Sequence, residues 1–212
     1  MDFLPDIATF GAFAAASFVL AVTPGPDMTL FISRTLSQGT RTGLVVLAGT
    51  TFGCLVHTLA AVTGVSALLA ASPEAFTLLK IVGAGYLLFL ALQTIRGGST
   101  FEVSRSKAPV TMRRAFLNGL GVNMLNPKVL LFFMTFLPQF VSAGDPAAPA
   151  KMAFLGVMFV VLTVPLLVLM IFGADRLAET LKSNPRVTRA LDWLFATVFA
   201  AFAVRILTAE GR

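Results

Sequence analysis

Residues 7–32 read IATFGAFAAASFVLAVTPGPDMTLFI, and this stretch decides the fold of the chain. An apolar run extends from Ile7 to Val22, stops at Thr-Pro-Gly-Pro-Asp (residues 23–27), and resumes from Met28 to Ile32. A helix needs about 20 apolar residues to cross the hydrocarbon core of a bilayer. Because proline removes a backbone donor and clashes with the preceding turn, the stretch predicts a membrane helix that is broken part-way along.

The composition of the whole chain is that of a membrane protein. Of its 212 residues, 57% are hydrophobic and 12% are charged, and the mean hydropathy is +0.87. A soluble domain has about 25% charged residues, so this chain has too few to cover a water-facing surface. We therefore interpret the net charge of +6 as basic loops that set membrane topology, rather than as a surface that binds nucleic acid.

Further apolar runs predict an all-α fold with about six transmembrane helices. The run at 115–141 is interrupted at Asn126-Pro127-Lys128, much as the first run is interrupted at its prolines. A basic stretch, 97–114, separates a three-helix half (1–96) from a second one (115–212), and we expect it to be a cytoplasmic linker. The other apolar runs are 42–71, 75–95, 152–174 and 190–207.

Basic residues gather in the loops on one side of this arrangement. They are Arg34 and Arg41 after the first run, Arg96, Arg105, Lys107, Arg113 and Arg114 after the third, and Arg176, Lys182, Arg186 and Arg189 after the fifth. The other side has at most Lys80, Lys151, Arg205 and Arg212. Since Lys and Arg are enriched in cytoplasmic loops, six spans predict a multi-pass membrane protein with both termini outside.

The two broken helices occupy matching positions, as the first and fourth of six. A helix break within the hydrocarbon core of the bilayer is tolerated only inside protein or beside a cavity, because the freed backbone N–H and C=O groups need hydrogen-bond partners. Aligning Pro24 with Pro127 also aligns Gly53 with Gly156. The halves are then inverted repeats, and broken helices in corresponding positions of such repeats indicate a transport site at the midplane. The alternative for each proline is a packing kink.

The residues at the breaks suit an amino acid zwitterion. The half-helix after Pro26 presents free N–H groups that favour a carboxylate, while Asp27 offers a negative charge to an ammonium group. Asn123 and Asn126 supply both donors and acceptors. The predicted substrate-binding residues are Pro24, Gly25, Pro26, Asp27, Asn123, Asn126, Pro127 and Lys128.

Three ionisable residues within the apolar runs are candidates for proton coupling: Asp27, His57 and Lys128. Asp27 and Lys128 could instead form an ion pair that only holds the halves together. His57 could be a proton relay or a core histidine bonded to a carbonyl. Gly49 and Gly53 lie four residues apart, a spacing typical of helix packing within or between protomers.

These residues resemble the LysE/RhtB family of bacterial amino acid exporters. The resemblance covers about residues 5–207 and implies a secondary exporter of amino acids in the bacterial cytoplasmic (inner) membrane, coupled to protons. We expect no cofactor. The absence of an acidic cluster in the helices favours a neutral substrate such as threonine, homoserine or leucine over a dibasic one. The carrying motifs are residues 23–27, Gly39, Gly43, Gly49, Gly53, His57, Lys80-x-x-Gly83-Ala84-Gly85-Tyr86-Leu87, Phe116-x-x-Gly119, Asn123, Asn126-Pro127-Lys128, Phe132-Phe133 and Pro138-Gln139-Phe140.

Other function classes fit the sequence less well. An intramembrane enzyme needs a nucleophile or a metal constellation, and the chain has one cysteine, Cys54, and one histidine, His57. The same count excludes an intrachain disulfide and a Cys/His zinc site. An exporter of metal cations or other small solutes and a non-catalytic membrane scaffold remain alternatives. The oligomeric state is open.

Overall fold

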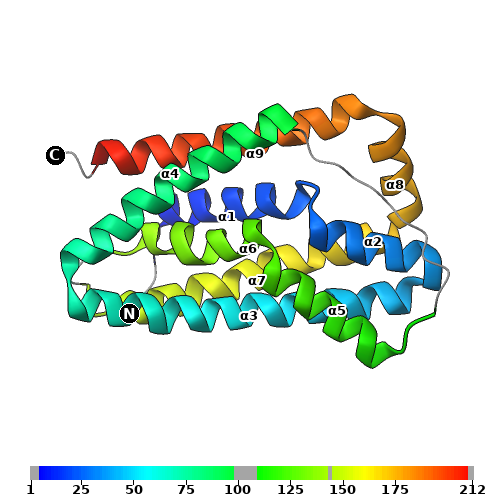
Figure 1. Cartoon of the computed structure of the whole chain (residues 1–212), viewed down its shortest axis with the longest axis horizontal. Helices are drawn as coiled ribbons and strands as arrows, with labels where there is room; N and C mark the ends of the chain where they lie inside the picture. The colour runs from blue at the N-terminus through cyan, green and yellow to red at the C-terminus, as the bar shows by residue number, and fades with distance from the viewer. Residues whose placement is uncertain (1–4, 98–108, 143–144, 210–212) are drawn as a thin grey trace.

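The computed structural model describes residues 5–97, 109–142 and 145–209, and every regular element in these ranges is helical. The predicted stretch 97–114 therefore lies mostly outside the described residues, as do Arg105, Lys107 and Arg212 and the side chain of Arg205. The elements (Figure 1) are α1 (Ile7–Val22), α2 (Pro26–Gln38), α3 (Thr40–Ala71), α4 (Pro73–Gly97), α5 (Met112–Leu125), α6 (Pro127–Leu131), the π-helix η1 (Phe132–Phe136), the 3-10 helix η2 (Leu137–Phe140), α7 (Ala148–Phe172), α8 (Ala174–Ser183) and α9 (Pro185–Ala209).

Four of these helices, α3, α4, α7 and α9, are long and apolar enough to cross a membrane singly. Two more crossings are bent pairs: α1 with α2, which meet at 51°, and α5 with the segment Pro127–Phe140, which meet at 56°. If each bent pair is one span, the described residues provide six. The predicted all-α membrane fold is confirmed, while the inverted relation between the halves stays a prediction.

Each break places a proline at the first position of a new helix. Pro26 opens α2 after Gly25, whose backbone is extended, and Pro127 opens α6 after Asn126. Proline is favoured there because the first N–H of a helix has no intrahelical acceptor and the fixed φ already suits the helix. By position, Pro127 corresponds to Pro26, whereas the sequence comparison aligned it with Pro24.

Two segments outside the apolar runs are helical in the structure. The first run continues as α2 to Gln38 rather than stopping near Ile32, and it ends at Gly39, where φ is +89°. Only glycine adopts that left-handed backbone without strain, so Gly39 ends the α2 helix. The hydropathy signal is lost earlier because the last turns are amphipathic.

The segment between the fifth and sixth runs is a helix as well. The apolar runs 152–174 and 190–207 leave a charged connection between them, and the structure has the ten-residue α8 there. Ala174, Ala178 and Leu181 are its buried residues, at the spacing of one helical face. Its charged residues, including Asp175 and Lys182, lie on the rest of its surface.

Helix α3 is the centre of the packing, with α5 on one side and α7 on another. A Cβ atom at Gly49 would overlap the carbonyl oxygen of Phe116, and one at Gly119 would overlap that of Val46. A Cβ at Gly53 would overlap the side chain of Asn123. Gly49 and Gly53 thus bring α5, and with it Asn123, against α3 within one chain.

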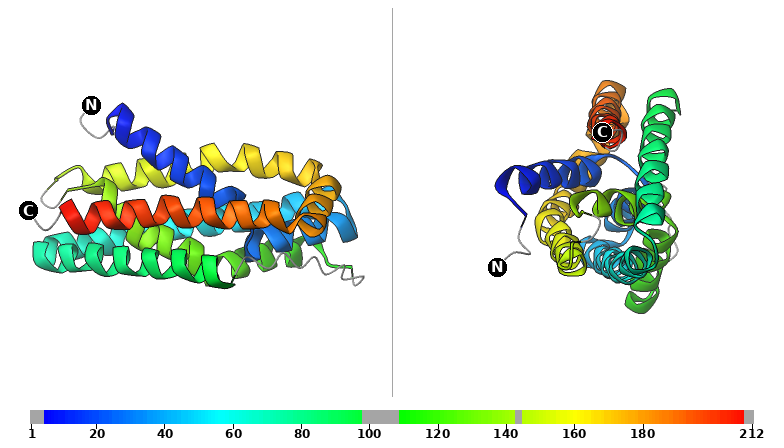
Figure 2. Two further views of the ribbon diagram at one scale, coloured as in Figure 1. Left: turned by 90° about the horizontal axis from the view of Figure 1, so that it is seen from above. Right: turned by 90° about the vertical axis from the view of Figure 1, so that its left-hand side faces the viewer.

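The long helices run along the long axis of the molecule, and α1 is tilted across the others (Figure 2). The start of α1, the turn between α3 and α4 and the end of α9 lie at one end of the bundle, on the left of Figure 1. Helix α8 and the start of α5 lie at the opposite end. Phenylalanines whose rings contact one another fill the core beside the second break, including the fully buried Phe13, Phe132, Phe133 and Phe136.

Candidate functional site

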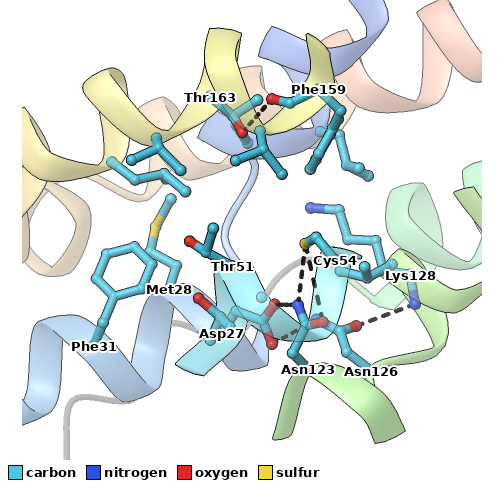
Figure 3. A pocket seen from close by; sticks show the side chains of 18 of the residues that line it. Asp27, Met28, Phe31, Thr51, Cys54, Asn123, Asn126, Lys128, Phe159 and Thr163 are labelled. Carbon is cyan, nitrogen blue, oxygen red and sulfur yellow. Dashed lines mark hydrogen bonds between the residues drawn. The ribbon is translucent and has the colours of Figure 1, made fainter. Parts of the chain in front are cut away.

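A cavity of about 70 Å³ lies where the two helix breaks meet (Figure 3). That volume holds several water molecules, since one needs about 10–15 Å³ measured in this way. Both breaks contribute to its lining: Thr23, Gly25 and Asp27 come from the first, and Asn126 and Lys128 from the second. The structure therefore brings together two motifs that are far apart in the sequence.

Asp27 is held by side chains from the other half of the chain. Asn123 Nδ2 donates a 2.6 Å hydrogen bond to its Oδ2, and Asn126 Nδ2 donates one of 3.0 Å to its Oδ1. Asp27 also lies in the first turn of α2, where the helix dipole favours a negative charge. These interactions replace part of the hydration that a carboxylate loses at this depth.

Lys128 turns its charge toward the first break without bonding Asp27. Its Nζ donates a 2.8 Å hydrogen bond to the Thr23 carbonyl oxygen and lies 5.0 Å from the centre of the Phe195 ring. Its backbone N–H donates to Asn126 Oδ1 at 3.1 Å, which caps α6. Within the described residues, the expected Asp27–Lys128 ion pair is not a direct contact, although the two charges interact electrostatically.

His57 contacts the site through Asn123 and does not line the cavity. It is 1% exposed, and its Nε2 lies 3.3 Å from the Asn123 carbonyl oxygen. Because a carbonyl can only accept, Nε2 carries a proton in that bond. The ring stacks on Phe133, and the thiol of Cys54 lies 3.7 Å from Asn123 Nδ2. His57 is thus one residue removed from Asp27, which it reaches through Asn123.

The wall opposite the helix breaks comes from α7. Figure 3 shows Phe159 and Thr163 facing Asp27 and Asn123 across the cavity. Among the described residues of the lining, Asp27 is the only carboxylate and Lys128 the only cation. The α7 residues of this wall are Phe159, Val160, Thr163, Val164 and Leu167.

Not every predicted site residue lines the cavity. Gly25, Asp27, Asn123, Asn126 and Lys128 do. Three prolines shape the breaks without being part of the lining: Pro24, Pro26 and Pro127.

The family of the chain follows from comparison with known proteins. A family model described as LysE type translocator matches residues 18–210. The chain belongs to the LysE type translocator family. It is therefore a membrane transporter and not an enzyme. No solved structure matches the chain.

Relatives of this LysE family member include named efflux proteins. The homoserine/homoserine lactone efflux protein of Salmonella typhimurium is 26% identical over 199 residues, which cover 94% of this chain and 96% of that protein. The leucine efflux protein of Klebsiella pneumoniae is 27% identical over 203 residues, or 92% of each chain. An uncharacterized membrane protein of Vibrio cholerae is 28% identical over 209 residues, 97% of this chain and all of that one.

Several residues at the site of this LysE translocator escaped the sequence analysis. Thr163 is the only hydroxyl within α7 and lies two residues before an internal proline, Pro165, which is a usable signal. Asp192 lies at the start of the last apolar run, 190–207, where no pattern singles it out, yet it is 1% exposed and interacts electrostatically with Lys128. Thr23 contributes its backbone carbonyl oxygen, which every residue has, so the residue type at this position gives no sequence signal.

Proposed function

We propose that this transporter exports neutral amino acids, such as threonine, homoserine or leucine, across the bacterial cytoplasmic membrane. One observation carries the proposal: Asp27 and Lys128 line the same cavity with opposite charges and without a direct bond between them. A site for a zwitterion needs both charges available at once. The names of the related homoserine and leucine efflux proteins support the same substrate class.

The binding mode follows from the positions of these charges. The ammonium group of the substrate lies at Asp27, whose two oxygens accept from Asn123 and Asn126 and keep further lone pairs for the ligand. The carboxylate lies at the Lys128 ammonium. The side chain of the substrate then points to the α7 wall, where Val160, Val164 and Leu167 favour an uncharged group.

Transport proceeds by alternating access in this proposal. Each half contributes one bent crossing to the site, and the bends are similar, at 51° and 56°. Rocking of one half against the other about these breaks would open the cavity to each side in turn, as expected for inverted repeats. Asp27, Lys128 and His57 are the groups that would couple this motion to protons.

The orientation of the chain in the membrane follows from its charges. In Figure 1, α8 and the starts of α3 and α5 lie at the same end of the bundle, and these segments include Arg176, Arg41 and Arg113, respectively. The positive-inside rule makes that end cytoplasmic, with Asp6 and the end of α9 outside.

The test is export from bacteria that express the protein and are fed a panel of dipeptides. Hydrolysis in the cell loads one free amino acid at a time, and its appearance in the medium is followed. We expect selective release of one or a few neutral amino acids, abolished by Asp27→Ala at equal protein levels. Release of no amino acid by correctly inserted protein would contradict the proposal and favour another small solute or a scaffold role.

A further inference from the structure

We propose that Thr163 is a specificity-determining residue, which makes the cavity prefer neutral amino acids with a side-chain hydroxyl over aliphatic ones of the same shape. Thr163 belongs to α7 and lines the cavity on the wall opposite the helix breaks. The inference rests on the proposed function and narrows its substrate class, because threonine and homoserine have such a hydroxyl and leucine does not.

The α7 wall of the cavity is apolar except at Thr163. Between Met152 and Phe172, Thr163 is the only polar side chain of the helix, and it is buried. Val160 and Val164 line the cavity beside it. A substrate hydroxyl that reaches this wall loses its hydration, which is costly unless a protein group replaces the lost hydrogen bond. Thr163 is the side chain of this wall that can do so.

The Thr163 hydroxyl is arranged to accept a hydrogen bond from a ligand. Its Oγ1 donates to the Phe159 carbonyl oxygen at 2.7 Å within the same helix (Figure 3). A hydroxyl has one proton and two lone pairs, so its lone pairs remain for a donor in the cavity. In the proposed binding mode the substrate ammonium lies at Asp27, and the donor that reaches α7 is a side-chain hydroxyl. A methyl group in its place leaves this bond unmade.

Three other threonines line the cavity, but they belong to other elements. Thr23 precedes the first break, and Thr50 and Thr51 belong to α3. The hydroxyls of Thr23 and Thr50 also donate to backbone carbonyl oxygens, at 2.6 and 2.9 Å. Since the substrate side chain points to α7 in the proposed binding mode, these residues face groups that all amino acids share. Thr163 is then the hydroxyl that discriminates between side chains.

The experiment compares amino acids of the same shape that differ only in a hydroxyl or a methyl group: threonine with valine, and homoserine with norvaline. Each pair is supplied as a labelled mixture to inside-out vesicles, and the ratio of initial uptake rates gives the ratio of kcat/KM. The unsubstituted protein should prefer the hydroxyl member of at least one pair by about two- to tenfold, the usual contribution of a hydrogen bond between uncharged groups. Thr163→Val should remove this preference, and Thr163→Ser should retain it.

The matched control is Thr58→Val. Thr58 is buried on α3 and donates to the Cys54 carbonyl oxygen at 2.8 Å in the same way, but it does not line the cavity. Its substitution should leave the ratio unchanged. Thr51→Val, whatever its effect on the rate, should leave the ratio unchanged as well, because Thr51 lies outside the α7 wall.

Three results would overturn the proposal: a preference that persists in Thr163→Val, one that disappears in Thr51→Val instead, or none in the unsubstituted protein. If Thr163→Val does not reach the membrane, Thr163→Ala removes the same hydroxyl and should give the same ratio. Transport of neither these amino acids nor leucine by the unsubstituted protein would contradict the proposed function instead.

Discussion

Asn123 Nδ2 donates a 2.6 Å hydrogen bond to Asp27 Oδ2, although 96 positions separate the two residues in the chain. The backbone carbonyl of Asn123 also lies 3.3 Å from His57 Nε2, so one residue joins the first broken helix, the second broken helix and α3. A carboxylate at membrane depth is costly unless such groups surround it. The contact therefore ties the integrity of the site to the packing of the two halves.

Asn123→Ala should weaken substrate binding by about tenfold or more, because a hydrogen bond to a charged group contributes about 1.5–3 kcal/mol. KM for transport in membrane vesicles is the measurement. Asn118→Ala is the matched control, since Asn118 belongs to the same helix and does not line the cavity. Equal KM values for both variants would mean that Asn123 does not contribute to substrate binding.

Val160→Phe should reduce transport of leucine more than transport of threonine. Val160 lines the α7 wall of a cavity of only about 70 Å³, so added bulk excludes the larger substrate first. The control is Val161→Phe at the neighbouring residue, which is 53% exposed and points away from the core. Loss of both substrates to the same extent in both variants would place the substrate side chain elsewhere.

Gly49→Ala should destabilise the protein by about 1–3 kcal/mol, the usual cost of overpacking. The new Cβ would overlap the Phe116 carbonyl oxygen, a backbone atom that moves only if α5 moves away from α3. Thermal unfolding in detergent is the measurement. Gly121→Ala is the control, because a Cβ there meets nothing within 4 Å. Similar melting temperatures for the two variants would mean that α3 and α5 are not in close contact.

The pH dependence of transport should not come from carboxylates at the helix ends. The Ser72 hydroxyl lowers the pKa of Glu74, and the Lys151 ammonium lowers the pKa of Asp145 through a 2.6 Å hydrogen bond. A lowered pKa keeps a carboxyl ionised above its ordinary range, and its contribution to stability is lost only as the pH falls through the lowered value. Between about pH 5 and 8 both groups are therefore constant.

Rates measured across that pH range should then give the same profile for Glu74→Gln and Asp145→Asn as for the unsubstituted protein. Asp27→Asn should flatten the profile of whatever transport it retains, because Asp27 is a proposed coupling group. A profile that changes with Glu74→Gln and persists in Asp27→Asn would locate proton coupling outside the cavity.

The sequence predicts the breaks and most of the polar site, because proline and intramembrane ionisable residues have few other uses. Asp27, Asn126 and Lys128 stand directly beside the prolines and line the cavity as expected. Asn123 could be found for the same reason, as an amide within an apolar run.

The remaining parts of the site depend on tertiary contacts that a local pattern does not encode. The α7 wall consists of residues such as Val160 and Leu167, which any membrane helix contains. Asp192 lies near the start of an apolar run, where an exposed flank is the simpler interpretation, and only the packing of α9 brings it near Lys128.

The central claim is that an amino acid zwitterion binds between Asp27 and Lys128. Its most direct test is counterflow of radiolabelled threonine, homoserine and leucine into proteoliposomes that contain the purified protein. The unsubstituted protein and Asp175→Asn should exchange at least one of them, and Asp27→Asn should raise KM about 30-fold or more, the usual cost of losing one buried charged partner. Asp27→Asn protein that exchanges the same amino acid with an unchanged KM and rate would contradict the account.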